Sequence, residues 1–314
     1  MRIIRSHHDL TDADRGASAA IGNFDGVHRG HHSVIDLARV EAQKLGAPLA
    51  VLTFEPHPRQ VFKPDAPDFR LMHAAGKAHK LDQLGVDILY ELPFSKDLAG
   101  LPPQAFAQEI LAQGLGLRHA VVGADFCFGQ GRTGTAQDLR KFGESLGYGV
   151  TIAELVQPSP EHPVISSTAI RSALSDGRPR DAAAMLGHLY RVEGQVLHGH
   201  KRGRELGFPT ANQSITGLHL PKFGVYAVKV EICNGPHQGN YTGVASMGVR
   251  PMFGENSPNL ETHIFDFAGD LYDAYISVGL VEYLRPEQKF DGLDGLIAQM
   301  NRDALAAKEI LATA

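Results

Sequence analysis

The chain has 314 residues, of which 43% are hydrophobic, and its formal net charge is −5 at pH 7. This length favours two domains, and the hydrophobic content is ordinary for a globular protein. The charge argues against nucleic acid as the main partner, because nucleic-acid-binding domains usually carry a basic face. The two cysteines, Cys127 and Cys233, form no CxxC pair, so we expect unpaired thiols in a reducing compartment. No apolar run is long enough for a signal peptide or a membrane span, which predicts a cytoplasmic protein without a membrane partner.

The first distinctive segment is a glycine-rich turn, GNFDGVHRGHH, at residues 22–32. It follows a small apolar run at 17–21 and precedes apolar side chains at helical spacing over 32–45, so we predict strand, turn and helix in that order. Glycines let a backbone approach a ligand closely, and a helix start attracts anions through its N–H groups and dipole. His28 and His31 stand at this junction, which predicts a phosphate site flanked by two imidazoles.

Strands and helices alternate through the first half of the chain. We predict further strands at 48–54, 86–92, 119–123 and 149–155, and helices at 74–84, 102–113 and 135–146. A strand, a helix and a strand form a right-handed crossover unit with parallel strands. Five such repeats predict a doubly wound α/β domain of Rossmann-like type.

Two loops directly follow strands of this domain. In EPHPR, residues 55–59, two prolines predict an extended, stiff segment; Arg59 would face the ligand crevice, although a structural turn is the simpler interpretation. The loop GADFCFGQGRTG, residues 123–134, is rich in glycine and aromatic residues, which alone is weak evidence because most such loops are turns. Both would lie at carboxyl ends of strands, where ligands of α/β sheets bind.

The segment ISSTAIR, residues 165–171, opens another helix. Its hydroxyls can cap the helix or contact an anion, and Arg171 falls on the same helical face as Thr168. From the residues alone, a plain helix cap is the favoured interpretation.

The pattern changes to period two near residue 187. We predict strands at 190–197, 224–232, 241–247, 260–267 and 274–283, followed by an amphipathic helix from about 293 to 311. Short strands without helices between them predict an antiparallel barrel or sandwich. We therefore divide the chain into domains at 1–186 and 187–314.

The first turn of the second domain is HGHKRGRELGFPTAN, residues 198–212. Glycines and basic side chains suit a nucleotide, although such loops are often solvated turns. Thr210 and Asn212 project to one side of an extended run. A hydroxyl and an amide oxygen can hold a Mg²⁺ that ATP phosphates and water already coordinate.

Two later segments carry candidate side chains. In NLETHIFDF, residues 259–267, Glu261 shares a strand face with His263 and Phe265, but the pattern does not say which face is inside. The segment YLRPEQKFD, residues 283–291, precedes the last helix and could be a loop that merely starts it.

These strings together resemble one family. HxGH resembles the nucleotidylyltransferase superfamily, and the longer string at 22–32 is similar to the adenylyltransferase module of bacterial bifunctional riboflavin kinase/FAD synthetases. GxxxGRxLGFPTAN resembles the flavokinase signature, and the resemblance spans nearly the whole chain. It implies that the Rossmann-like domain is followed in the chain by a β-barrel kinase domain with a C-terminal helix. The implied reactions are phosphorylation of riboflavin by ATP to FMN, then adenylylation of FMN by ATP to FAD and pyrophosphate, with Mg²⁺.

The resemblance also implies roles for individual residues. In the first domain the catalytic residues would be His28, His31 and Arg171. The nucleotide contacts would be Gly22, Phe24, Asp25, Gly26, Asp125, Ser167 and Thr168. The flavin contacts would be Arg59, Phe126 and Phe128. In the second domain the catalytic base would be Glu261; the metal ligands Thr210 and Asn212; the nucleotide contacts Gly199 and Arg204; and the flavin contacts Arg285 and Phe290.

The two implied reactions need different groups. The riboflavin hydroxyl is neutral and must lose a proton, so a carboxylate base is useful. The FMN phosphate is already an anion, so its transfer needs only positioning and neutralisation of charge. The second half should therefore contain an essential carboxylate, and the first half need not.

The first half departs from the family pattern in places. Ala169 stands where many relatives have a second arginine, Cys127 and Gln130 stand where basic residues are common, and residues 72–85 lack the expected acidic–basic helix opening. These departures bear on the rate of the adenylyl step and on the affinities of its site for ATP and flavin, whereas the two histidines and Arg171 are retained.

Three other interpretations remain open at this point. One is a different cytidylyl- or adenylyltransferase fused to an unrelated barrel, against which the PTAN and ETH strings count. Another is a flavin sensor without turnover, against which the retained metal ligands and base count. The third is a metal site at His28, His31 and His32, whose spacing differs from the i, i+4 pairs of helical zinc sites. The sequence also leaves a transient homo-oligomer open.

Overall fold

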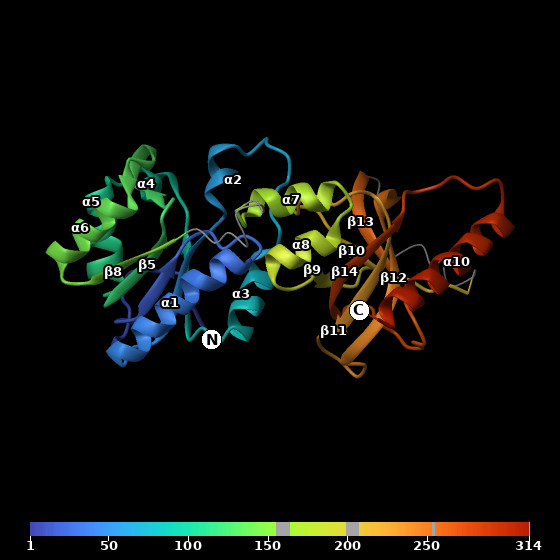
Figure 1. The fold of residues 1–314 in the computed structure, drawn as a ribbon, viewed down its shortest axis with the longest axis horizontal. Helices are drawn as coiled ribbons and strands as arrows, with labels where there is room; N and C mark the ends of the chain where they lie inside the picture. Colours follow the sequence, from blue (N-terminus) through green and yellow to red (C-terminus); the bar gives the residue numbers. More distant parts are fainter. Residues whose placement is uncertain (155–163, 199–206, 253–254, 314) are drawn as a thin grey trace. The chain divides into compact units, whose positions relative to one another are not determined.

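The computed structural model describes residues 1–154, 164–198, 207–252 and 255–313 (Figure 1). Contacts divide the chain into two compact units: Met1–Pro67 with Ala74–Ser166, and Asp68–His73 with Ser167–Ala314. The short segment 68–73 thus joins the second unit, as do residues 167–186, which we placed in the first domain.

The first unit is built on a six-stranded sheet in the order β1-β4-β3-β2-β5-β8, in which every neighbouring pair is parallel. The strands are β1 (Arg2–Ile4), β2 (Ser18–Ile21), β3 (Leu49–Glu55), β4 (Ile88–Pro93), β5 (His119–Gly123) and β8 (Gly149–Ala153). This confirms the Rossmann-like fold class. β1 was not predicted, because an edge strand of three residues carries almost no periodic signal.

Helices connect these strands as expected, with added short pieces. They are α1 (Arg29–Leu45), α2 (Pro58–Phe62), α3 (Ala74–Gln83), α4 (Lys96–Gly100), α5 (Pro103–Ala105), a π-helical segment (Phe106–Gly114) and α6 (Ala136–Leu146). Two single turns of 3₁₀ helix (Asp12–Asp14, Gln130–Arg132) and a small hairpin of β6 (Cys127–Phe128) and β7 (Gly134–Thr135) complete the unit.

The strand order determines where this unit can bind a ligand. β2 lies between β3 and β5, so the connections that leave its two neighbours run in opposite directions across the sheet. Ligands of doubly wound sheets bind outside the carboxyl ends of the strands at such a switch point. The segments that follow β2, β3 and β5 begin at this edge, and they contain the two histidines, Arg59 and Asp125 respectively.

The second unit is built on six antiparallel strands in the order β10-β13-β12-β11-β14-β9. They are β9 (Tyr190–Gln195), β10 (Ala211–Ser214), β11 (Gly224–Ile232), β12 (Gly239–Met252), β13 (Glu255–Ile264) and β14 (Tyr275–Arg285). A bridge between Leu197 and Asn212 brings the two edges together, so the sheet is a nearly closed barrel. This confirms the predicted barrel class, although β10 was missed, and β12 and β13 differ from the predicted 241–247 and 260–267.

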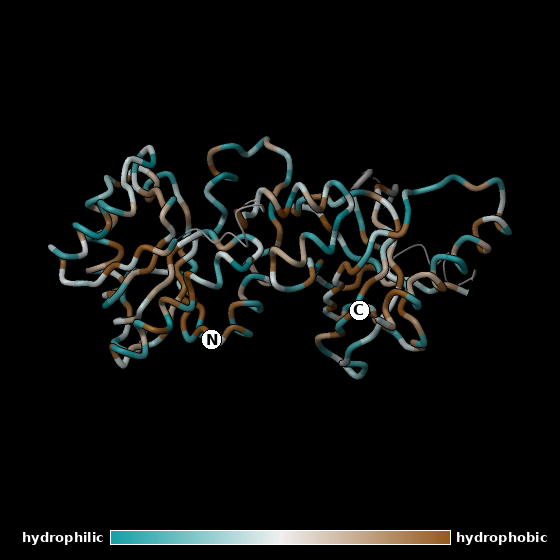
Figure 2. The backbone as a smooth tube through the Cα atoms, in the orientation of Figure 1, coloured by the Kyte–Doolittle hydropathy of each residue, from teal (hydrophilic) through white to brown (hydrophobic). Residues whose placement is uncertain are grey.

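Apolar side chains fill the barrel interior. Tyr226, Val228, Met247 and Leu260 belong to one buried cluster, and Figure 2 shows hydrophobic residues concentrated along the strands. Outside the barrel, α10 (Leu293–Leu311) packs through Ala307 against Ala227 and Phe265. Helices α7 (Ser167–Ser175) and α8 (Pro179–Leu186) add Leu174 and Leu186 to the interior cluster.

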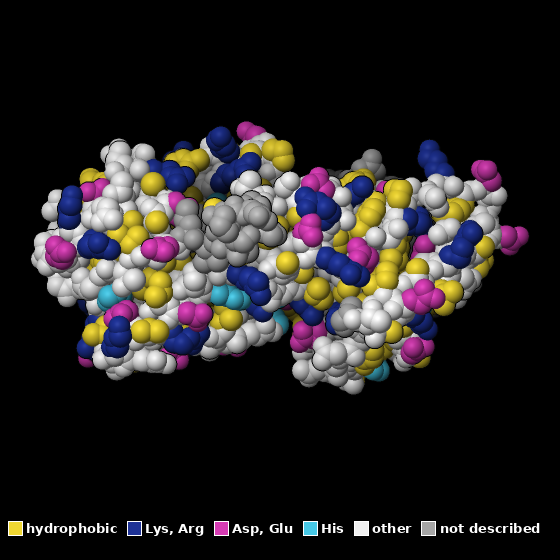
Figure 3. Space-filling model, viewed as in Figure 1, with side chains coloured by type: hydrophobic (Ala, Val, Ile, Leu, Met, Phe, Trp, Pro, Cys, Tyr) yellow, Lys and Arg dark blue, Asp and Glu magenta, His cyan; other side chains and the backbone are white. Residues whose placement is uncertain are grey.

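Basic and acidic side chains are interspersed on the face that Figure 3 shows. Within the described residues, no helix is both long and apolar enough to cross a membrane.

Candidate active sites

His28 and His31 hold the first turn of α1 through a reciprocal cap. His28 is the N-cap residue, and its Nδ1 accepts the backbone N–H of His31 at 3.2 Å. In return, Nδ1 of His31 accepts the backbone N–H of His28 at 3.3 Å. The rings stack with centroids 3.6 Å apart and planes 15° apart. Since each Nδ1 is an acceptor, the neutral rings bear their protons on Nε2, which makes both imidazoles N–H donors.

The environment keeps His31 neutral. Burial lowers its pKa well below the usual 6.5, and the charges of His28, His32 and Lys77 act in the same direction. His28 is buried, with 7% of its surface exposed, and His31 is partly buried. A neutral donor in a buried site suits hydrogen bonding to phosphate oxygens better than base catalysis.

The turn before these histidines is strained. Phe24 has φ of 51° and Val27 has φ of 41°, a left-handed region that side chains rarely adopt. Each such residue costs about 1–3 kcal/mol and persists only when its surroundings hold it. Gly26, with φ of 87°, adopts this region without that cost. Phe24 is fully buried and its ring lies 5.0 Å from that of His31, so the strained turn supports the imidazole pair.

A buried lysine stands beneath this turn, and the sequence interpretation missed it. Lys77 of α3 is 2% exposed, and its Nζ lies 2.8 Å from Oε1 of Glu55 and 3.1 Å from Oγ1 of Thr53. A signal was present, because Lys77 precedes buried Leu81 by one helical turn within the segment 72–85 that we read as a departure.

The loop EPHPR differs from the prediction. The extended segment was wrong: Pro58 is the first residue of α2, and Nδ1 of His57 caps it by accepting the N–H of Arg59. Proline is favoured at this position because its missing N–H would have had no helical partner. Arg59 is exposed in the first turn of α2.

An aromatic row crosses the carboxyl edge of the sheet. Its rings follow one another with centroids 5.5–6.4 Å apart in the order Phe126, Phe128, Phe106, Phe54, Phe94, Phe62. Phe128 is only 6% exposed, so it supports the row from within, whereas Phe62 at the far end is 63% exposed. Phe62 was missed because no helix was predicted at residues 58–62. Asp125 lies exposed in the turn before Phe126.

Arg171 belongs to the second unit and is held there. Its Nη2 donates to Oγ1 of Thr168 at 3.3 Å, as the i, i+3 spacing predicts, and its Nη1 donates to the Phe69 carbonyl at 3.3 Å. The guanidinium lies 5.9 Å from the Phe69 ring centroid. Ser167 is the first residue of the same helix, α7.

In the barrel, register brings the candidate base and a candidate metal ligand together. Asn212 of β10 pairs directly with Glu261 of β13. Leu260 and Thr262, which flank Glu261 on β13, are fully buried, so Glu261 faces the outside of the barrel, which the sequence pattern could not decide. Nδ2 of Asn259 donates to Oε1 of Glu261 at 3.3 Å. A carboxylate and an amide oxygen therefore stand side by side.

The segment before β10 is tied to the same strand. Nδ1 of His263 lies 2.9 Å from the carbonyl oxygen of Pro209, and its ring is 5.0 Å from that of Phe208. Thr210 comes next in the chain, and its carbonyl accepts a hydrogen bond from Asn212 at 3.4 Å. Gly199 and Arg204 lie outside the described residues.

Arg285 anchors the C-terminal helix. Its Nε and Nη2 donate to the carboxylate of Asp303 at 2.9 and 2.6 Å, and Asp303 is 7% exposed. Gln299 donates to the same carboxylate at 2.8 Å. Phe290 lies 5.9 Å from the guanidinium, so the two predicted flavin contacts lie close together, one at the end of β14 and the other in the segment before α10.

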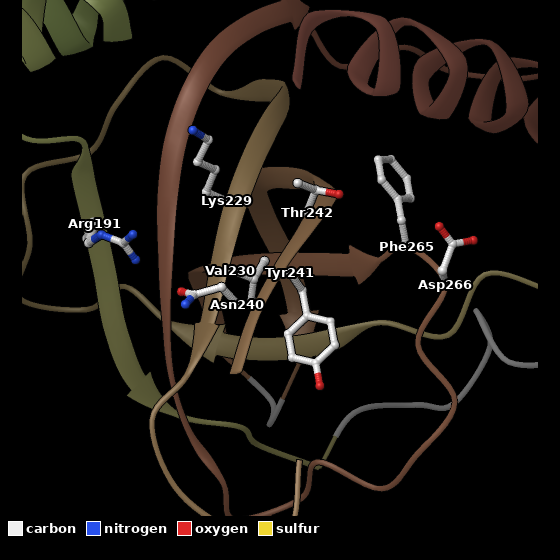
Figure 4. Close-up of a pocket in the computed structure, with 8 residues that line it drawn as sticks. All are labelled: Arg191, Lys229, Val230, Asn240, Tyr241, Thr242, Phe265 and Asp266. Atoms are coloured by element: carbon white, nitrogen blue, oxygen red, sulfur yellow. The ribbon is translucent and has the colours of Figure 1, made fainter. Parts of the chain in front are cut away.

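A cavity of about 490 Å³ opens elsewhere on the barrel (Figure 4). Its lining contains none of the predicted site residues and consists of Arg191, Lys229, Val230, Asn240, Tyr241, Thr242, Phe265 and Asp266. Among the described residues, no group of three or more His, Cys, Asp or Glu side chains is arranged to hold a metal ion.

Comparison with known proteins covers both units. The FAD synthetase family model matches residues 10–169, and the riboflavin kinase model matches residues 186–311. The bifunctional riboflavin kinase/FMN adenylyltransferase of Pseudomonas fluorescens is 40% identical over 313 residues, which are 99% of this chain and 98% of that protein. The chain belongs to the bifunctional riboflavin kinase/FMN adenylyltransferase family.

Other relatives agree over the same length. The riboflavin kinase/FMN adenylyltransferase of Escherichia coli K12 is 39% identical over 98% of this chain and 97% of its own. A crystal structure titled a macrolide-efflux protein of Streptococcus pneumoniae has a TM-score of 0.83 and 32% identity, over 99% of this chain and 98% of that one. Residues 170–185 lie between the two family matches, and our domain boundary at 186/187 stays a prediction.

Proposed function

We propose that this member of the riboflavin kinase/FMN adenylyltransferase family carries out both reactions in flavin cofactor biosynthesis. In the first, ATP phosphorylates riboflavin to FMN and ADP; in the second, ATP adenylylates FMN to FAD and pyrophosphate. The observation that carries the proposal is the difference between the two sites. A carboxylate faces an amide in the barrel, whereas two neutral imidazoles cap a helix at the sheet edge.

In the kinase step, Glu261 takes the proton of the riboflavin hydroxyl as the oxygen attacks the γ-phosphate of ATP. The oxygens of Thr210 and Asn212 would hold a Mg²⁺, which when bound would neutralise charge on the phosphates. The residues fit this ion, because two neutral oxygen donors suffice for a Mg²⁺ that phosphates and water also coordinate. We propose Gly199 and Arg204 at the nucleotide, and Arg285 and Phe290 at the flavin.

In the adenylyl step, a phosphate oxygen of FMN attacks the α-phosphate of ATP and pyrophosphate leaves. The nucleophile needs no base, so His28 and His31 serve as Nε2–H donors to oxygens whose charge increases, and Arg171 neutralises the leaving pyrophosphate. Around the nucleotide we propose Gly22, Phe24, Asp25, Gly26, Asp125, Ser167 and Thr168. For the flavin we propose Arg59, Phe126 and Phe128, and we add the exposed Phe62.

The direct test supplies purified protein with riboflavin, ATP and Mg²⁺ and separates the products by chromatography. We expect FMN and FAD to form, and FMN supplied alone with ATP and Mg²⁺ to give FAD. Formation of neither product would leave a flavin sensor as the better account. FMN without FAD would remove the adenylyl assignment only.

We also propose a cytoplasmic location. A transient homo-oligomer can be checked by light scattering during turnover.

A further inference from the structure

Among the lysines of the described ion pairs, Lys77 has the most deeply buried side chain, of which 3% is exposed. A buried ammonium is strongly unfavourable unless it is paired and hydrogen-bonded. Glu55, at the end of β3, supplies the opposite charge at 2.8 Å. Neither side chain has a role in the proposed reactions so far, so the position of this pair needs a reason.

The other contacts of Lys77 lead to the glycine-rich turn. Its Nζ lies 3.4 Å from the carbonyl oxygen of Asn23 and 3.1 Å from Oγ1 of Thr53. Thr53 in turn donates to the same Asn23 carbonyl at 3.1 Å. Lys77 therefore reaches this carbonyl both directly and through Thr53.

The Asn23 carbonyl belongs to the peptide that leads into the strained part of the turn. Phe24 follows it with φ of 51°, Val27 has φ of 41°, and His28 then caps α1. A backbone in this region needs external contacts to hold it. Two donors on the carbonyl of residue 23 fix the peptide plane at the point where the strained stretch begins.

We propose that Lys77, paired with Glu55, is a positioning residue for the adenylyl step, which holds the Asn23–His28 turn so that His28 and His31 point their Nε2–H groups at the phosphates. This inference rests on the proposed adenylyl function. Lys77 acts through the turn and does not itself touch the reacting atoms. Its positive charge also helps to keep His31 neutral, in the same direction as the larger effect of burial.

A purely structural ion pair is the competing explanation, and a double substitution separates the two. Lys77→Met removes the ammonium that pairs with Glu55, whose side chain is only 16% exposed, so this variant should lose both stability and adenylyl rate. Lys77→Met with Glu55→Gln removes both charges and should unfold at nearly the wild-type temperature. The Asn23 carbonyl would still lack the Nζ contact, so the adenylyl kcat should stay about 10²-fold low, as for a misplaced catalytic group.

The experiment measures kcat and KM for conversion of FMN to FAD, the kinase rate in the same sample, and the unfolding temperature. We expect the double variant to keep the kinase rate and nearly the wild-type KM for ATP while its adenylyl kcat falls. Lys141→Met, in the same unit with a side chain 75% exposed, is the matched control and should behave as wild type.

Recovery of the adenylyl kcat together with stability in the double variant would overturn the proposal, as would a wild-type kcat in Lys77→Met. Absence of adenylyl activity from the wild-type protein would instead contradict the proposed function, so the two failures are distinguishable.

Discussion

The two candidate sites are proposed for similar phosphate-transfer reactions, but they are built on different secondary structure. At the edge of the parallel sheet, two histidines use their Nδ1 atoms to cap α1. Their rings are thereby held in place as Nε2–H donors. In the barrel, strand register sets Glu261 opposite Asn212. A helix start supplies donors for an anion that is already formed, whereas a strand pair supplies acceptors that can take a proton and hold a cation. The backbone on which each site is built thus suits the reaction proposed for it.

Glu261→Gln should separate the activities of the two sites by the largest factor. The amide keeps the size of the side chain and its contact with Asn259 but cannot take a proton. We expect FMN formation to fall about 10²–10⁴-fold, the range for loss of a general base, while added FMN is still converted to FAD. Separate assays with riboflavin and with FMN measure this. Loss of both activities in folded protein would contradict the two-site assignment.

His31→Gln tests the opposite side of the comparison. Glutamine at the third helical position can still accept the backbone N–H of His28, as in a capping box, so α1 should form. The ring Nε2–H is lost, and we expect the adenylyl kcat to fall about 10²–10³-fold, as when one transition-state donor is removed. His28→Ser, which keeps a capping oxygen, is the matched partner and should give the same result. An unchanged FMN-to-FAD rate in both variants would exclude the imidazoles as donors.

How far the sequence could predict these sites differs between them. Residues 17–45 contain the whole first turn, so strand, turn and histidines could be read locally. Asn212 and Glu261 are distant in the chain, and their pairing depends on β10, a four-residue strand (ANQS) without clear alternation. The family resemblance therefore pointed to the two residues, but nothing in the sequence predicted their contact. Lys77 and Phe62 were missed because their roles come from packing against loops that the chain brings together only on folding.

His263 offers a smaller test on the barrel side. Its ring lies 2.9 Å from the Pro209 carbonyl oxygen, directly before Thr210, so it would act on the proposed metal ligands indirectly. His263→Phe keeps an aromatic ring beside Phe208 but removes the hydrogen bond. We expect about a 10-fold loss in kinase activity or Mg²⁺ affinity, the lower end for a residue that supports metal ligands. A Mg²⁺ titration of the kinase rate measures it, and the adenylyl rate in the same samples should stay unchanged.

The smallest effect concerns pH, and the part of it that comes from His31 should appear in the first unit. The pKa of His31 is well below its usual 6.5 in the folded protein, so the unfolded chain binds the proton more readily. The resulting stability is present above about pH 6.5 and is lost as pH falls from there towards the folded pKa, at up to about 1.4 kcal/mol per pH unit. Calorimetry between pH 8 and pH 5 should therefore show the transition of the first unit shifting down on acidification.

His31→Gln removes this titrating group, so its transition should shift less with pH than that of the wild-type protein. His219 belongs to the second unit, and burial lowers its pKa too. His219→Gln is thus the matched control, which should change the pH dependence of the other transition. If His31→Gln and wild type lose stability in parallel below pH 6.5, His31 is not held neutral by the fold. Its role as a neutral donor, on which the contrast with Glu261 depends, would then be wrong.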